Sequence, residues 1–196
     1  MVEREQRYTQ DPLFWRAGAI AATIFMSIVL AALTIDTLRQ ITPGSPRVPS
    51  YDVINNSIAY EYDPARAEYA PKIGSEELLF GHKYSPEEAA ALIGKGKLVI
   101  QSRACIDCHT FFGNGAYYAP DLTRAWMDPV WTHYSGDKRG DRLAKFLMNP
   151  LRLGARPMPN LRIGRDEAEA LVAYLKWMSS VDSNGFPDRF GAASRQ

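Results

Sequence analysis

Two cysteines and a histidine stand in one five-residue motif, Cys105-Ile106-Asp107-Cys108-His109, and the 196-residue chain has no other cysteine. This C-x-x-C-H spacing is the attachment signature of c-type haem. The two thiols add across the two vinyl groups of the porphyrin, and the histidine is then held beside the iron as its proximal ligand. The motif therefore predicts one covalent haem c bound through Cys105, Cys108 and His109.

Two other interpretations of the cysteine pair have less support. A thioredoxin-like redox pair needs a βαβ setting, which the surrounding sequence does not indicate. A structural zinc site needs four ligands, and no second cysteine pair or histidine cluster accompanies the motif.

A haem that carries electrons needs a sixth iron ligand, for which five side chains are candidates: Met127, Met148, Met158, Met178 and His133. Met148 and Met178 fall on expected helix faces, where methionine is usually core filler. Met158 differs because Arg156-Pro157-Met158-Pro159-Asn160 presents one side chain between two prolines. We expect Met158 to be the ligand and His133 to be a surface or loop residue. A thioether opposite histidine raises the reduction potential, which suits electron transfer.

The haem motif must be positioned by the rest of the chain, which begins with an apolar run. Residues 17–35 contain nineteen residues without a charge, and about 20 mostly apolar residues span the hydrocarbon core. A cleaved signal peptide is the alternative, but its apolar region is usually about 7–15 residues. We expect an uncleaved anchor over 17–38, with 1–16 in the cytoplasm. Three arginines before the run and two after it favour this orientation weakly.

Residues 39–84 are rich in proline and tyrosine, and we expect an extended linker that packs on a partner. Helices are expected from Ser85, which with Glu88 forms a capping box, from about Asp141 to Met148, and from near Asp166. No strand is convincing. The fold prediction is all-α: a class I cytochrome c-like domain with one haem over 85–182, behind one N-terminal transmembrane helix, with 183–196 as a tail.

Composition excludes several classes of function. Hydrophobic residues make up 46% and charged residues 23% of the chain, which indicates a packed core and not a disordered protein. The formal net charge is +1, so no basic surface for nucleic acid is indicated. Haem attachment takes place outside the cytoplasm, and the haem domain is therefore expected in the periplasm, with the anchor in the inner membrane.

The chain closely resembles the membrane-anchored cytochrome c subunit of bacterial cytochrome c-dependent nitric oxide reductase. The most specific match is the run CIDCHTFFGNGAYYAPD over 105–121, because its part after C-x-x-C-H is not general to cytochromes c. Residues 174–187 resemble the family's C-terminal helix and its exit, and Gly96-Lys97 the helix that leads to its haem motif. The resemblance implies a non-catalytic electron-transfer subunit, with Cys105, Cys108, His109 and Met158 holding the haem.

The same resemblance implies partners and a second metal. The partners are a large polytopic catalytic subunit with b-type haems and non-haem iron, and a soluble periplasmic donor, either a cytochrome c or a cupredoxin. A calcium ion at the junction between the subunits would take the carbonyl of Gly115 and the hydroxyl of Tyr117, oxygen donors that suit a hard cation. Two departures from the family are Asn114, where glutamate is usual, and the long 40–84 segment.

Three alternatives stay open. The haem-c subunit of a cbb-type oxygen reductase shares the anchor and the C-x-x-C-H motif, although GNGAYYAPD is not expected there. A free-standing anchored cytochrome c shuttle would need neither a calcium junction nor a linker with buried aromatics. A quinol-oxidising reductase of the same superfamily has a fused domain without the haem motif, which Cys105, Cys108 and His109 argue against.

Overall fold

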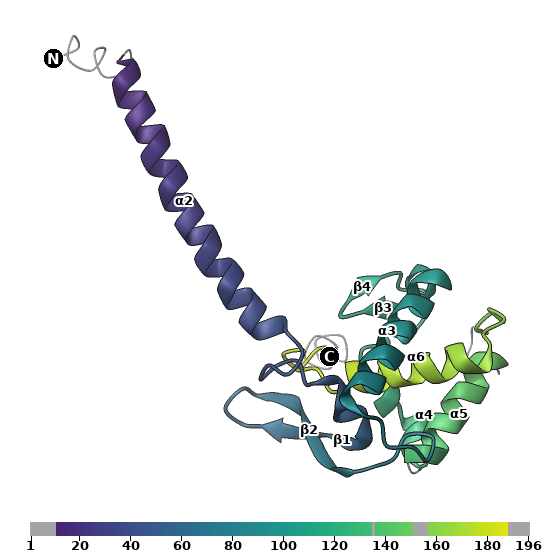
Figure 1. Cartoon of the computed structure of the whole chain (residues 1–196). Helices are drawn as coiled ribbons and strands as arrows, with labels where there is room; N and C mark the ends of the chain where they lie inside the picture. Colours follow the sequence, from purple (N-terminus) through teal and green to yellow (C-terminus); the bar gives the residue numbers. More distant parts are fainter. Residues whose placement is uncertain (1–10, 135, 151–156, 188–196) are drawn as a thin grey trace, which may run out of the picture. The chain divides into compact units, whose positions relative to one another are not determined.

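The computed structural model describes residues 11–134, 136–150 and 157–187, and the chain divides into two units, residues 1–42 and 43–196. The first unit is dominated by helix α2, Pro12–Ile41 (Figure 1). Asp11 caps it, since its Oδ1 accepts a hydrogen bond from the Leu13 amide at 2.9 Å. No residue of α2 is buried, and its length and apolar composition are sufficient to cross a membrane. The expected anchor, 17–38, lies inside it.

The second unit is mostly helical, as expected. Its elements in chain order are η1 (Tyr51–Asn55), β1 (Asn56–Asp63), β2 (Glu68–Glu76), α3 (Pro86–Ser102), η2 (Cys105–Asp107), β3 (Thr110–Phe111), β4 (Asn114–Gly115), η3 (Ala125–Met127), α4 (Pro129–Thr132), α5 (Gly136–Met148) and α6 (Arg165–Met178). The helices expected from 85, 141 and 166 correspond to α3, α5 and α6. Helix α5 begins five residues earlier than expected because polar residues fill its first turn.

Helices α3 and α6 cross closely, and Gly96 makes the crossing possible. A Cβ at this position would clash with the Ala170 carbonyl and with Cβ of Tyr174. Ser85 and Glu88 form the expected capping box at the start of α3. Hydrogen bonds join the end of α3 to the start of α6. The guanidinium of Arg103, directly after α3, donates to both carboxylate oxygens of Glu167 in α6, at 2.9 and 2.7 Å.

The core lies between these helices, α5 and the loops that connect them. Its fully or almost fully buried apolar side chains include Ile54, Leu79, Ala89, Ile93, Val99, Trp126, Leu143, Ala168, Leu171, Val172, Leu175 and Met178. Because Cys105 belongs to the same cluster, the haem motif is anchored directly on the core of the domain.

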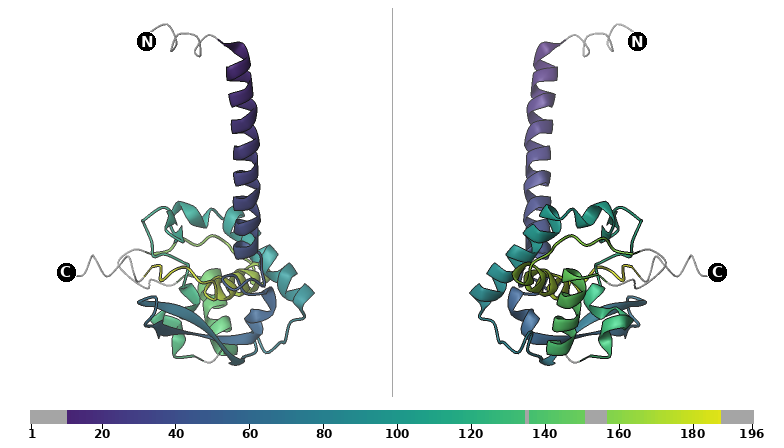
Figure 2. Two further views of the ribbon diagram at one scale, coloured as in Figure 1. Left: turned by 90° about the vertical axis from the view of Figure 1, so that its left-hand side faces the viewer. Right: turned by 90° about the vertical axis from the view of Figure 1, so that its right-hand side faces the viewer.

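The sequence prediction of no strand is wrong, because β1 and β2 form an antiparallel hairpin within the proline-rich segment. Ile58, Tyr60 and Tyr62 alternate along β1 and lie on one face, a period-2 pattern that indicates a strand. Pro71 is compatible with β2 because this sheet has two strands in the described part of the chain, so β2 has a free edge. Tyr60 donates to the Ser179 carbonyl at 2.6 Å, and both views of Figure 2 place the hairpin beside the end of α6.

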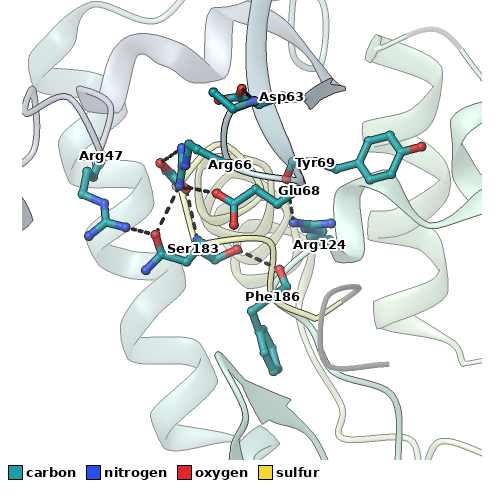
Figure 3. Close-up of polar contacts among 11 residues, drawn as sticks. Arg47, Asp63, Arg66, Glu68, Tyr69, Arg124, Ser183 and Phe186 are labelled. Atoms are coloured by element: carbon teal, nitrogen blue, oxygen red, sulfur yellow. Dashed lines mark hydrogen bonds and ion pairs between the residues drawn. The ribbon is translucent and has the colours of Figure 1, made fainter. Parts of the chain in front are cut away.

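We call residues 47–77 the strap, because polar contacts fasten them to the exit of α6. The Asp182 amide donates to the Arg47 carbonyl at 2.9 Å, and the Trp177 indole donates to the Pro49 carbonyl at 3.0 Å. Arg66 makes a two-pronged contact with Asp182 at 2.8 and 3.0 Å and pairs with the buried Glu68 (Figure 3). Much of the 39–84 segment therefore packs on the chain's own domain; its contact with a partner stays a prediction.

A second polar contact that holds the strap, an ion pair, is buried beside α5. The Lys176 ammonium, fully buried on α6, pairs with the Glu77 carboxylate at 3.2 Å and lies 4.9 Å from the ring centre of Trp126. The Arg139 guanidinium lies 4.9 Å from the same ring. Burial lowers the pKa of Lys176 to about 8, although the charge and hydrogen bond of Glu77 act to raise it.

Candidate haem site

A single tight turn gathers the three residues of the haem motif. The backbone amides of Cys108 and His109 both donate to the Cys105 carbonyl, at 3.2 and 2.9 Å. The turn is entered through Ala104, which adopts a left-handed conformation with φ of 51°. Cys105 is buried and Cys108 is half-buried. Burial raises the pKa of the Cys105 thiol, so it is protonated at neutral pH.

A backbone carbonyl group orients the imidazole of His109. Its Nδ1 lies 2.7 Å from the carbonyl oxygen of Pro120. A carbonyl can only accept, so Nδ1 carries the proton and donates it. This contact leaves Nε2, the second ring nitrogen, as the atom with a lone pair for a metal.

The chain after the motif folds back beside it as a short ladder. Backbone amides donate from Ala116 to the carbonyl of Ile106 at 3.0 Å and from Ala119 to that of Cys108 at 2.8 Å. Strands β3 and β4 close the turn between these segments. Gly115, with φ of 127°, is required there because a Cβ would clash with the His109 carbonyl oxygen.

Met158 stands between Pro157 and Pro159, and its side chain is half-buried against the core cluster that contains Cys105. Its neighbours 151–156 lie outside the described residues. Met178 is fully buried in α6, and Met127 and Met148 are partly buried against the same core. His133 is exposed and packs against Tyr134 with 3.9 Å between ring centres.

The two residues expected to bind calcium lie on the β3–β4 turn and the residues that follow it. Gly115 is exposed, and the Tyr117 side chain is 82% exposed. The Tyr117 hydroxyl donates to the Gly113 carbonyl oxygen at 3.0 Å. Gly115 and Tyr117 would therefore supply two of the six to eight oxygen ligands that calcium takes.

The donor set fits a c-type haem. The turn at 105–109 supplies two thiols in the C-x-x-C spacing and an imidazole whose Nδ1 is already bonded to Pro120. Met158 adds a soft thioether next to the same core. These side chains would hold the porphyrin covalently and ligate its iron, the chemistry that the sequence motif predicts.

Sequence reasoning assigned no role to three residues that organise the site. Pro120 supplies the acceptor for His109, and the Asp121 carboxylate accepts from the Thr110 hydroxyl at 2.6 Å. Pro120 and Asp121 lie within the quoted run of 105–121, but their contacts form only when the chain folds back. The sequence feature that could have indicated this contact is a threonine, Thr110, directly after the motif histidine and eleven residues before Asp121.

The fold and the motif together define a cytochrome c domain, and residues 93–179 match the cytochrome c family. Such a domain carries haem c covalently.

Among cytochromes c, the chain is similar to the C subunit of nitric oxide reductase. It is 29% identical over 114 residues to that subunit from Stutzerimonas stutzeri, an alignment that covers 57% of this chain and 75% of the relative. The subunit from Halomonas halodenitrificans is 32% identical over 98 residues, 47% of this chain and 62% of the relative. That from Paracoccus denitrificans is 32% identical over 95 residues, 47% and 63% respectively. The chain thus matches between about three-fifths and three-quarters of each relative's length.

Proposed function

We propose that this chain is the electron-transfer subunit of a nitric oxide reductase. It would accept electrons from a soluble periplasmic donor and pass them to a polytopic catalytic subunit. There two molecules of nitric oxide, two electrons and two protons give nitrous oxide and water. The observation that carries the proposal is the folded C-x-x-C-H turn, with His109 bonded to Pro120, in a domain whose relatives bear that reductase's name.

The residues of this chain have separate tasks in the proposal. Cys105 and Cys108 would attach the porphyrin, and His109 and Met158 would supply the ligands of its iron. Bound haem c would supply a reversible one-electron couple, and a histidine and a methionine ligand would raise its potential and favour electron transfer over substrate chemistry. We therefore place no catalytic residue in this chain, and its task is to hold and orient the redox group.

The strap favours a subunit with a fixed place over a free-standing shuttle. A shuttle needs a flexible tether between its anchor and its redox domain. Here Arg47 and Pro49, a few residues after the apolar helix, already accept hydrogen bonds from Asp182 and Trp177. A long free tether is thus missing from the described part of the chain.

The proposal also includes a calcium site and an orientation of the chain in the membrane. Gly115 and Tyr117 would contribute two oxygen ligands at a junction where the catalytic subunit supplies the others. The N-terminus would lie in the cytoplasm and the cytochrome domain in the periplasm, anchored in the inner membrane by the helix Pro12–Ile41.

The test is purification of the chain from its native membrane in mild detergent. We expect a polytopic partner, b-type haem, non-haem iron and consumption of nitric oxide in the same fraction. The double variant Cys105→Ala, Cys108→Ala is the matched control, and we expect it to retain the partner but lose covalent haem and donor-driven turnover. Copurification with a copper-containing oxygen reductase, or a lone haem protein, would contradict the proposal.

A further inference from the structure

The carboxylate of Asp121 ties together both sides of the loop that carries His109. Its Oδ2 accepts from the Thr110 hydroxyl at 2.6 Å and from the Gly113 amide at 3.3 Å. Its Oδ1 accepts from the Thr123 amide at 2.8 Å. Three donors from two chain segments thus converge on one side chain, and a charged acceptor makes such bonds stronger than neutral ones.

These bonds lie directly beside the contact that orients the imidazole. Thr110 follows His109, and Asp121 follows Pro120, so the side-chain bond Thr110–Asp121 is the next rung after the bond from His109 to Pro120. A third rung joins the Leu122 amide to the Thr110 carbonyl at 2.8 Å. Because the second and third rungs hold the residues that follow Pro120, they restrict movement of the Pro120 carbonyl away from His109.

Burial makes the second rung resistant to competition from water. Thr110 is 3% exposed and Thr123 is 1% exposed. The Thr123 hydroxyl also accepts from the Phe112 amide at 2.7 Å, so both threonines have their hydroxyl groups engaged inside the loop. Removing one partner would leave a buried polar group without its bond, which is costly.

We propose that Asp121 and Thr110 are positioning residues that hold the Pro120 carbonyl against Nδ1 of His109 and thereby set the reduction potential of the bound haem. This inference rests on the proposed ligation by His109. A hydrogen bond donated from Nδ1 makes Nε2 a more basic ligand, which stabilises the oxidised iron and lowers the potential. Weakening the hydrogen bonds between Asp121 and Thr110 is therefore expected to raise the reduction potential of the haem.

The test compares four variants of the full chain in detergent micelles. Thr110→Val removes the hydroxyl without changing charge, and Thr110→Ser restores it. Asp121→Asn weakens the carboxylate clamp, and Asp107→Asn is the matched control, because Asp107 is an exposed carboxylate two residues before His109. The readouts are the reduction potential and the exchange rate of the Nδ1 proton, measured by NMR on the reduced protein.

We expect Thr110→Val and Asp121→Asn to shift the potential upward and to speed Nδ1 proton exchange about tenfold or more. Thr110→Ser is expected to keep both values. Asp107→Asn removes a charge near the haem but none of the bonds to Asp121, so we expect it to keep the exchange rate of the Nδ1 proton and to shift the potential by less than Asp121→Asn does. Unchanged values in haem-loaded Thr110→Val, or equal shifts in Asp121→Asn and Asp107→Asn, would overturn the clamp. If the wild-type chain carries no covalent haem, the proposed site itself fails, which is a separate result visible in the absorption spectrum. Should Asp121→Asn not fold, the Thr110 pair decides.

Discussion

The loop around His109 and the strap over α6 are both held by polar contacts, but these contacts join residues at very different separations. In the loop, the bonds to Pro120 and Asp121 span eleven positions. In the strap, Arg66 reaches Asp182 across 116 positions, and Lys176 reaches Glu77 across 99. A local loop can be encoded in one motif, whereas the strap depends on a domain that is already packed.

The difference predicts different consequences of mutation. Changes in the loop should alter the reduction potential and the spectrum of the redox group. Changes in the strap should lower the free energy of unfolding and leave the haem spectrum intact. The four predictions that follow test this separation, from the largest expected effect to the smallest.

Met158→Ala should give the largest effect, since it removes the proposed sixth ligand. We expect the methionine-to-iron band at the red end of the oxidised spectrum to disappear and the reduction potential to fall, because the thioether favours the reduced iron. Absorption spectroscopy and potentiometry measure both. Met127→Ala, also partly buried, is the control that should keep the band. A band that survives in Met158→Ala refutes the ligand assignment.

Gly96→Ala tests the helix crossing on which both regions rest. The added methyl group meets the Ala170 carbonyl, and such overpacking costs about 1–3 kcal/mol. Gly94→Ala, on the same helix but with nothing within 4 Å, should instead stabilise by about 0.5–1 kcal/mol. Denaturant unfolding measures both changes. Equal effects of the two substitutions would show that the crossing is not tight.

Glu77→Gln tests the buried fastening of the strap and gives it a pH signature. The variant leaves the Lys176 charge without its carboxylate, which we expect to cost about 1–3 kcal/mol at pH 7. Glu76→Gln is the control, because Glu76 pairs with Lys83 at the surface.

The pH dependence follows from the lowered pKa of Lys176, about 8 in the folded chain against 10.5 for an ordinary lysine. Glu77 raises the pKa of Lys176, so the lysine of Glu77→Gln loses its proton at a lower pH than the wild-type lysine does. The stability difference between the variant and the wild type should therefore shrink as the pH rises toward about 8 and change little above it. Between about pH 8 and 10.5 the unfolded chain binds more protons, so this lysine makes wild-type stability rise with pH. A difference that stays constant from about pH 6 to 10 would contradict the assignment.

Arg66→Met should give the smallest effect, about 1 kcal/mol, because the side chain is 36% exposed and solvent screens its pairs. Burial acts to raise the pKa of Asp182, but the hydrogen bond and charge of Arg66 lower it below its ordinary value. Arg66→Lys should recover only part of the loss, since lysine lacks the planar fork. Thermal unfolding measures the change, and a haem spectrum altered by Arg66→Met would break the separation between strap and loop.

The sequence predicted most of what depends on short spacing. The haem motif, the capping box of Ser85 and Glu88 and the three main helices could be identified because each is encoded within a few residues. The mostly helical fold class is confirmed, and residues 93–179 match the cytochrome c family. The ligand role of Met158 and the calcium role of Gly115 and Tyr117 stay predictions.

The hairpin and its partners could not be predicted in the same way. Five prolines between 43 and 71 masked the alternation of Ile58, Tyr60 and Tyr62, because proline usually interrupts strands. The choice of Asp182 as the partner of Arg66 depends on where α6 ends in three dimensions. Likewise, Lys176 looks like a solvated helix residue in the sequence, and only the packing of Trp126 and Glu77 around it shows that it is buried.

The strap also sets an order of events during synthesis. Its residues leave the ribosome first, and their partners at the end of α6 leave last, with Arg66 and Asp182 separated by 116 residues. At about 5–20 residues per second, the strap waits on the order of ten seconds for the helix that it fastens. Cys105 and Cys108 leave the ribosome within this interval, so the haem motif is synthesised before the strap can be fastened to the end of α6.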